Sequence, residues 1–280
     1  MKRGREKKAQ ITIFIIIAII IVVVVVLFYF TNQKKQASQE YFLQESIKPG
    51  FIAVQSGIIE CTKETSEKAL ETIGVQGGYY KNLKKEPIKS VELETLFIPY
   101  YYYQGQYLMP SREIIENQLS LYINDNLENC INEIKQPDFD LLYKKPITST
   151  KINEKNVAFT INYDIRIEKS SYTTTYELKD HKVIIDSEID GILNLASFLT
   201  ESHKQDSEMY CISCVHEIAD EDDFYIDTLT FGENEMLVII SENHTSSEPY
   251  SFEFLNKYKG DERSPVEIGG KAPDAPSDSK

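Results

Sequence analysis

The run from Ile11 to Phe30 constrains this chain more than any other part of its sequence. It holds twenty residues without a charge, most of them Ile or Val, directly behind a basic segment. A helix of that length spans about 30 Å, the thickness of the hydrocarbon core of a bilayer. A cleaved secretory signal has a shorter apolar core that ends in small residues, and a soluble helix is rarely apolar on every face. The sequence therefore predicts a transmembrane helix at residues 11–30.

Charged flanks predict how this helix crosses the membrane. Five Lys or Arg precede it, and only Lys34 and Lys35 follow it closely. Because the more basic flank stays in the cytoplasm, we expect a cytoplasmic N-terminus and an extracytoplasmic remainder. The predicted parts are a basic leader at 1–10, the transmembrane helix at 11–30, a helical part with an aromatic hairpin at 31–137, a part rich in antiparallel sheet at 138–260, and a disordered tail at 261–280.

The three residues before the apolar run, Lys8-Ala9-Gln10, resemble the class III signal of archaeal type IV pilin-like proteins. In that family a membrane peptidase cuts on the cytoplasmic side between the small residue and Gln, which implies cleavage between Ala9 and Gln10. Pilin subunits usually carry Glu at the fifth mature position, where this chain has Phe14. The resemblance therefore implies processing more than filament assembly, and an uncut anchor is the alternative.

The charge balance limits the partners. The net charge is −14, and without the five basic residues and Glu6 of the first ten residues it is −18. Such a surface repels DNA, RNA and anionic lipid heads, so nucleic-acid binding is excluded. The expected partners are the lipid bilayer, through the apolar helix, and a membrane or cell-surface protein. No cofactor is expected.

Residue periodicity predicts an α+β fold, because helices and strands come in separate runs. The predicted helices lie at 36–47, 51–73, 191–203 and 213–219, with one more that Ser111 caps and that continues to residue 131. The predicted strands lie at 96–103 and 107–110, which form a hairpin, and at 157–167, 172–178, 183–185, 224–231, 236–241 and 250–255. The alternation of apolar and polar residues from Val157 to Glu168 is the clearest strand signal.

The body behind the apolar run also resembles uncharacterised single-pass archaeal membrane proteins. The positions that carry this resemblance are Gln76-Gly77-Gly78-Tyr79, Ile98-Pro99-Tyr100-Tyr101-Tyr102-Tyr103, Cys211-Ile212-Ser213-Cys214 and Pro249-Tyr250-Ser251-Phe252-Glu253-Phe254. The resemblance implies the same membrane location and no particular activity. The four consecutive tyrosines suit either a recognition surface or a hairpin with half of them in the core.

Four cysteines follow the predicted membrane helix, an even number in a compartment that permits disulfides. We favour Cys61 with Cys130, since each lies on an amphipathic helix, and Cys211 with Cys214. Two free buried thiols are the alternative for the first pair. The Cys-x-x-Cys spacing of the second pair also suits thiol-disulfide exchange, but residues 201–209 lack the strand that a thioredoxin-like site needs.

Three further patterns are weaker. Zinc ligation by His203, Cys211, Cys214 and His216 fits the usual ligand spacing poorly, and residues 220–223 lack the spaced ligands of an EF-hand. Asn243 begins an N-x-[ST] sequon in a predicted surface turn. We therefore assign no catalytic and no metal residue. The sequence predicts a non-enzymatic, membrane-anchored cell-surface protein of structural or binding role, and the alternative is an extracytoplasmic thiol-disulfide oxidoreductase.

Overall fold

The computed structural model describes residues 50–82, 87–134, 139–169, 172–205, 215, 217–219, 223–242 and 250–259. Internal contacts divide the chain into two units, Met1–Ser56 and Gly57–Lys280, and the architecture below concerns the second. The apolar run at 11–30, the predicted helix at 36–47 and the tail at 261–280 lie outside the described residues. Within the described ranges, no helix has the length and apolar character needed to cross a bilayer.

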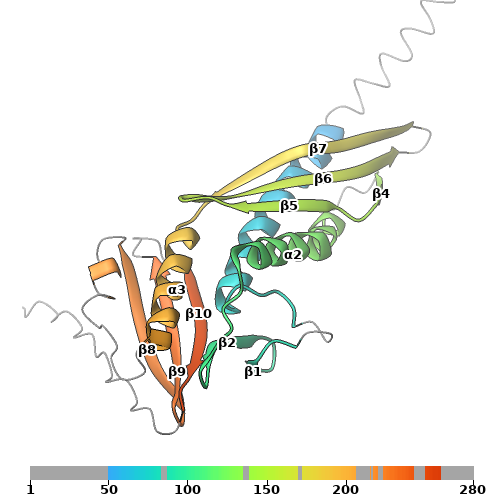
Figure 1. The fold of residues 1–280 in the computed structure, drawn as a ribbon. Coiled ribbons are helices and arrows are strands. Elements are labelled where there is room, and N and C mark those ends of the chain that lie inside the picture. The colour runs from blue at the N-terminus through green and yellow to red at the C-terminus, as the bar shows by residue number, and fades with distance from the viewer. Residues whose placement is uncertain are drawn as a thin grey trace, which may run out of the picture. The chain divides into compact units, whose positions relative to one another are not determined.

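A helix runs through residues 50–75, which confirms the helix predicted at 51–73 (blue in Figure 1). Its buried positions recur every three or four residues, as in an amphipathic helix. From residue 57 onward they include Ile58, Cys61, Thr62, Thr65, Ser66, Ala69, Leu70 and Ile73. Ile59 is apolar but 44% exposed. Ile59 follows a buried position and therefore lies about 100° further round the helix.

Glycines end this helix and allow it to approach a strand. Gly77 and Gly78 adopt positive φ angles of 51° and 87°, and the amide of Gly78 donates to the carbonyl of Ile73 at 2.8 Å. This is the left-handed helix end that glycine favours. Gly74 lies within the last turn, where a Cβ atom would collide with the carbonyl oxygen of Ser251. The helix therefore packs closely against the chain at Ser251.

The second helix, α2 (Arg112–Asn132), begins where the sequence predicts. Ser111 is its N-cap, and the Ser111 hydroxyl accepts the amide of Ile114 at 3.4 Å. Ile115, Leu119, Ile123, Leu127 and Ile131 are fully buried along one face. Ile114 is apolar but 42% exposed, because it lies beside this stripe.

The first sheet joins strands from both ends of the described chain (Figure 1). Its strands are β1 (Ser90–Glu92), β2 (Phe97–Tyr103), β3 (Gln106–Tyr107), β8 (Phe224–Gly232), β9 (Glu235–Glu242) and β10 (Ser251–Lys257). The order is β1-β2-β10-β9-β8, with β3 paired to β2. The predicted hairpin of β2 and β3 is confirmed, and Gln104 and Gly105 form its turn with positive φ angles. The pairing of β2 with β10 is parallel, whereas the other pairings in this sheet are antiparallel.

β2 lies inside the sheet, between β1 and β10, and most of its tyrosines are therefore buried. Tyr100, Tyr101 and Tyr102 are 7%, 0% and 4% exposed, whereas an outer hairpin would bury only alternate residues. Both faces of β2 are covered, and Tyr101 stacks on Phe254 of β10 with ring centroids 4.4 Å apart. Most of the tyrosine run is therefore core.

The second sheet is antiparallel and is built around one long strand, β6 (Asn156–Lys169). β7 (Tyr172–Asp186) pairs along one edge of β6, while β4 (Asp140–Tyr143) and β5 (Ile147–Ile152) pair along the other. The alternation predicted from Val157 to Ile167 is confirmed, since the six apolar positions are at most 2% exposed. Neither β4, β5 nor β1 was predicted, because each is short and only partly apolar.

β7 is one strand, so the prediction of two short strands at 172–178 and 183–185 is wrong. The polar residues between them resemble a turn, but their backbone continues the ladder with β6. A bulge between Ile161 and Tyr163 accommodates Asp180, whose φ is 47°. The amide of Asp180 donates to the side chain of Asn162 at 2.9 Å, which fixes the bulge.

Hydrogen bonds tie the helices to the second sheet. Ser120 of α2 lies 2.8 Å from the hydroxyl of Thr150 on β5, and Glu116 accepts the amide of Ile152 at 3.0 Å.

A third helix, α3 (Ile189–Gln205), follows β7 and packs against β8, where Gly191 leaves room for the ring of Phe224. Residues 215 and 217–219 are helical, as predicted. The fold is mixed α+β.

Candidate functional site

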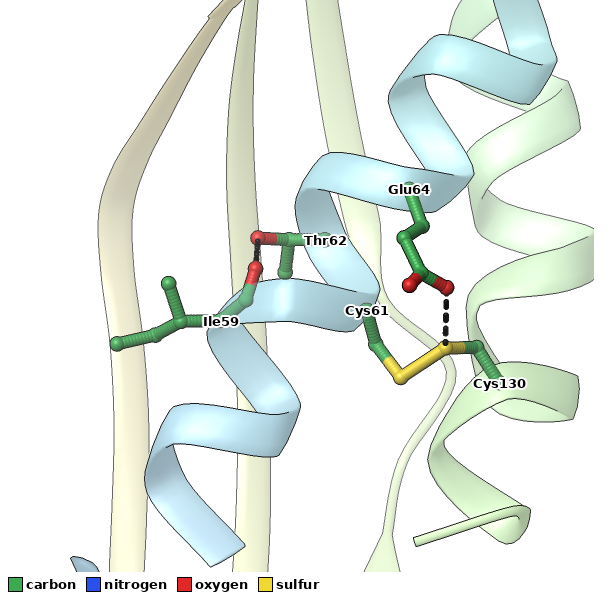
Figure 2. The surroundings of a disulfide bond; sticks show 5 residues. All are labelled: Ile59, Cys61, Thr62, Glu64 and Cys130. Atoms are coloured by element: carbon green, nitrogen blue, oxygen red, sulfur yellow. Dashed lines mark hydrogen bonds between the residues drawn. A yellow bond between two sulfur atoms is a disulfide. The ribbon is translucent and has the colours of Figure 1, made fainter. Parts of the chain in front are cut away.

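A disulfide joins Cys61 to Cys130, the pairing that the sequence favours. Cys61 lies on the helix of residues 50–75 and Cys130 on α2, with Cα atoms 5.6 Å apart (Figure 2). The two helices lie side by side at this point, where Gly57 also faces the side chain of Ile134 just after α2. Cys61 is only 4% exposed, so Cys130 is the more accessible half of the bond.

A carboxylate lies beside the accessible sulfur. Oε2 of Glu64 is 3.8 Å from Sγ of Cys130, as Figure 2 shows. The oxidised sulfur has no proton to donate, so the contact places negative charge next to the atom that a reducing thiolate would attack. Such a neighbour opposes reduction of the bond, because the thiolate is the reactive species in disulfide exchange.

Most other residues singled out from the sequence lie outside the described residues. These are Ala9 and Gln10 of the leader, Cys211 and Cys214 with His216, and Asn243 of the sequon. The leader cleavage, the second disulfide, the exchange chemistry and the glycosylation remain predictions. Among the described residues, no group of His, Cys, Asp and Glu is arranged to hold a metal ion.

A cavity of about 540 Å³ lies where four segments meet, and we call it the aromatic cavity. It is lined by Tyr79, Pro87, Ile88, Lys89, Tyr100, Leu108, Ile114 and Gln118. Tyr79 follows the glycines that end the first helix, Tyr100 comes from β2, and Ile114 and Gln118 lie on the first two turns of α2. Its volume is in the range of small-molecule sites, about 300–1,000 Å³.

The tyrosines of this cavity are neutral. Burial raises the pKa of Tyr79. Burial also raises the pKa of Tyr100 to about 12, with a further contribution from the carboxylate of Glu235, which hydrogen-bonds the hydroxyl. Both rings therefore present uncharged hydroxyls across the neutral pH range.

Two other side chains give the cavity its polar character. Gln118 is 7% exposed, and its Oε1 accepts the amides of Tyr80 and Lys81 at 2.9 and 3.2 Å. Lys89 is exposed, and its ammonium lies 3.6 Å from the centre of the Tyr103 ring in a cation–π contact. Lys89 is the one charged side chain among the described residues of the wall.

A second cavity, of about 530 Å³, is acidic. Five carboxylates line it, those of Glu67, Glu71, Asp186, Glu242 and Glu253, and no described basic residue does. Glu242 is occupied structurally, because its Oε1 accepts the amide of Glu188 at 2.7 Å. Burial raises the pKa of Glu253.

Sequence reasoning missed both cavities. The aromatic cavity combines residues between positions 79 and 118 that belong to a helix end, one strand, the segments next to two other strands, and a second helix. No spacing motif marks such a set, because tertiary packing brings it together. The chain as a whole matched no family model, no curated protein and no solved structure.

Proposed function

We propose that this chain is a membrane-anchored cell-surface protein that acts by binding, with its N-terminal helix in the bilayer. The apolar run from Ile11 to Phe30 and its basic flank support the anchor. Lys8-Ala9-Gln10 supports a pilin-like leader that is cut before Gln10. The body of the protein lies outside the cytoplasm.

The disulfide between Cys61 and Cys130 is the observation that carries this location. Structural disulfides persist in oxidising compartments and are rare in the cytosol of most cells. The disulfide links two helices that follow the apolar run in sequence. The carboxylate of Glu64 lies beside its accessible sulfur, that of Cys130. The binding role rests on the aromatic cavity, which has the size and wall composition of a ligand site.

Protease treatment tests the location. Protease added to intact cells should remove the part of the chain beyond residue 50 and leave a short membrane-embedded fragment. Full protection in intact cells, with digestion only after the membrane is opened, would reject the proposed topology. Mass spectrometry of the mature N-terminus tests the leader: a chain that begins at Gln10 supports cleavage, and one that begins at Met1 refutes it.

A further inference from the structure

We propose that the aromatic cavity binds a small carboxylic acid with a flat apolar or aromatic body. This deepens the binding role proposed above, since it names the class of ligand for that role. Three features carry it: an apolar wall, an amide donor, and a single positive charge at the rim.

The wall accommodates a flat apolar group. Tyr79, Tyr100, Leu108 and Ile114 contribute rings and branched side chains, and Ile114 is 42% exposed although apolar. An apolar body in contact with Ile114 would remove that surface from water, which is favourable in proportion to the area covered. The cavity of about 540 Å³ is large enough for two fused rings.

Gln118 lines this cavity and supplies an amide donor. Its carbonyl oxygen is used by the amides of Tyr80 and Lys81, whereas its amide nitrogen donates to no residue that the structure describes. An acceptor on a bound ligand would satisfy it.

Lys89 supplies the charge at the rim. Its ammonium contacts the Tyr103 ring and forms no ion pair with a described carboxylate. The Gln118 amide and the Lys89 charge thus share a wall with no carboxylate among its described lining residues. The nearby carboxylate of Glu235 is occupied by Tyr100 and Lys257, so the wall selects an anionic acceptor over a cation.

The acidic net charge of the chain does not oppose this selection at short range. Salt screens charges beyond about 8 Å at physiological ionic strength, so the groups on the wall dominate. The acidic surface lowers the association rate of an anion more than it lowers the affinity once the anion is bound. Raised salt should therefore increase the association rate.

Calorimetric titration of the full chain in lipid nanodiscs tests the proposal, with empty nanodiscs as the blank. The probes are 2-naphthylacetate and its neutral counterpart 2-naphthylacetamide, which share the apolar body. We expect the acid to bind about tenfold more tightly than the amide, as a charge-assisted hydrogen bond provides. Absence of binding by either probe, or equal binding of both, would overturn the proposal.

Three variants assign the effect to the cavity. Lys89→Gln should remove most of the difference between acid and amide, whereas Lys182→Gln, which removes the same charge from an exposed position on β7, should preserve it. Gln118→Glu keeps an acceptor for the two backbone amides but replaces the donor with a carboxylate, so binding of the acid should fall at least tenfold.

The controls separate local from general effects. If Lys182→Gln weakens the acid as much as Lys89→Gln does, binding reflects net charge and the site is refuted. Circular dichroism checks that Gln118→Glu folds. If that variant does not fold, Lys89→Gln still tests the proposal, because Lys89 is exposed and its substitution should leave the fold intact. Failure here leaves the membrane location untouched, because the protease experiment tests that separately.

Discussion

Removal of the disulfide between Cys61 and Cys130 should destabilise the protein by about 4 kcal/mol. The bond closes a loop of 69 residues. In the chain-entropy model, a cross-link across a loop of that length restricts the unfolded chain by about 4 kcal/mol at 25 °C. For a domain of this size, the change corresponds to a fall in Tm of about 10–15 °C.

The double variant Cys61→Ala/Cys130→Ala suits this measurement. Alanine avoids a buried hydroxyl at position 61, where the side chain is 4% exposed. Guanidinium unfolding of the full chain in detergent, followed by circular dichroism, gives the free energy of unfolding for the parent and the variant. Because the effect acts on the unfolded state, refolding should slow more than unfolding accelerates.

Two results would contradict this reasoning. A loss below about 1 kcal/mol with native circular dichroism would mean that the unfolded chain does not gain the expected freedom. A variant that refolds at the parent rate but unfolds much faster would place the stabilisation in native contacts instead.

Three other perturbations have expected outcomes. Glu64→Gln should speed reduction of the disulfide by dithiothreitol roughly fivefold at low salt and less at high salt, because the carboxylate beside the sulfur repels the thiolate; an unchanged rate would exclude this role. Gly74→Ala should destabilise the fold by about 3 kcal/mol or more in thermal or denaturant unfolding, since its Cβ would overlap the backbone of β10. Gly57→Ala is the matched control, because its Cβ meets only the side chain of Ile134, at 3.2 Å or more, and helix propensity should offset the contact. Burial lowers the pKa of His181 below its ordinary 6.5, so the unfolded chain binds more protons and stability should fall as pH drops below about 6.5. Unfolding at pH 7 and pH 5 should show a smaller loss in His181→Gln, and equal losses would contradict the assignment.

Local patterns in the sequence predict most elements of the fold. The alternation along β6, the cap at Ser111 and the turn at Gln104 and Gly105 each arise from neighbouring residues, so they could be found without tertiary information. The amphipathic faces that carry Cys61 and Cys130 likewise point to the observed cross-link.

Long-range pairing explains what the sequence could not reveal. The short strands β4 and β5 exist because the long β6 offers them an edge, and their own residues give little signal. The continuous β7 follows from pairing with β6 in spite of its polar middle. Gln118 lies on an ordinary polar helix position, and its role at the aromatic cavity depends on the chain near Tyr80.

The parallel partner of β2 has a consequence for synthesis. β2 begins at Phe97 and β10 ends at Lys257, so at about 5–20 residues per second β2 waits roughly 8–30 seconds for its partner. During that interval the most aromatic segment of the chain is an open edge prone to aggregation. Pro99 lies within β2 and has no backbone N–H to donate to a neighbouring strand. It therefore disfavours pairing of this edge with another chain before β10 is made. The early hairpin with β3 covers the opposite edge of the same strand, so the edge that receives β10 stays open until the last strand emerges.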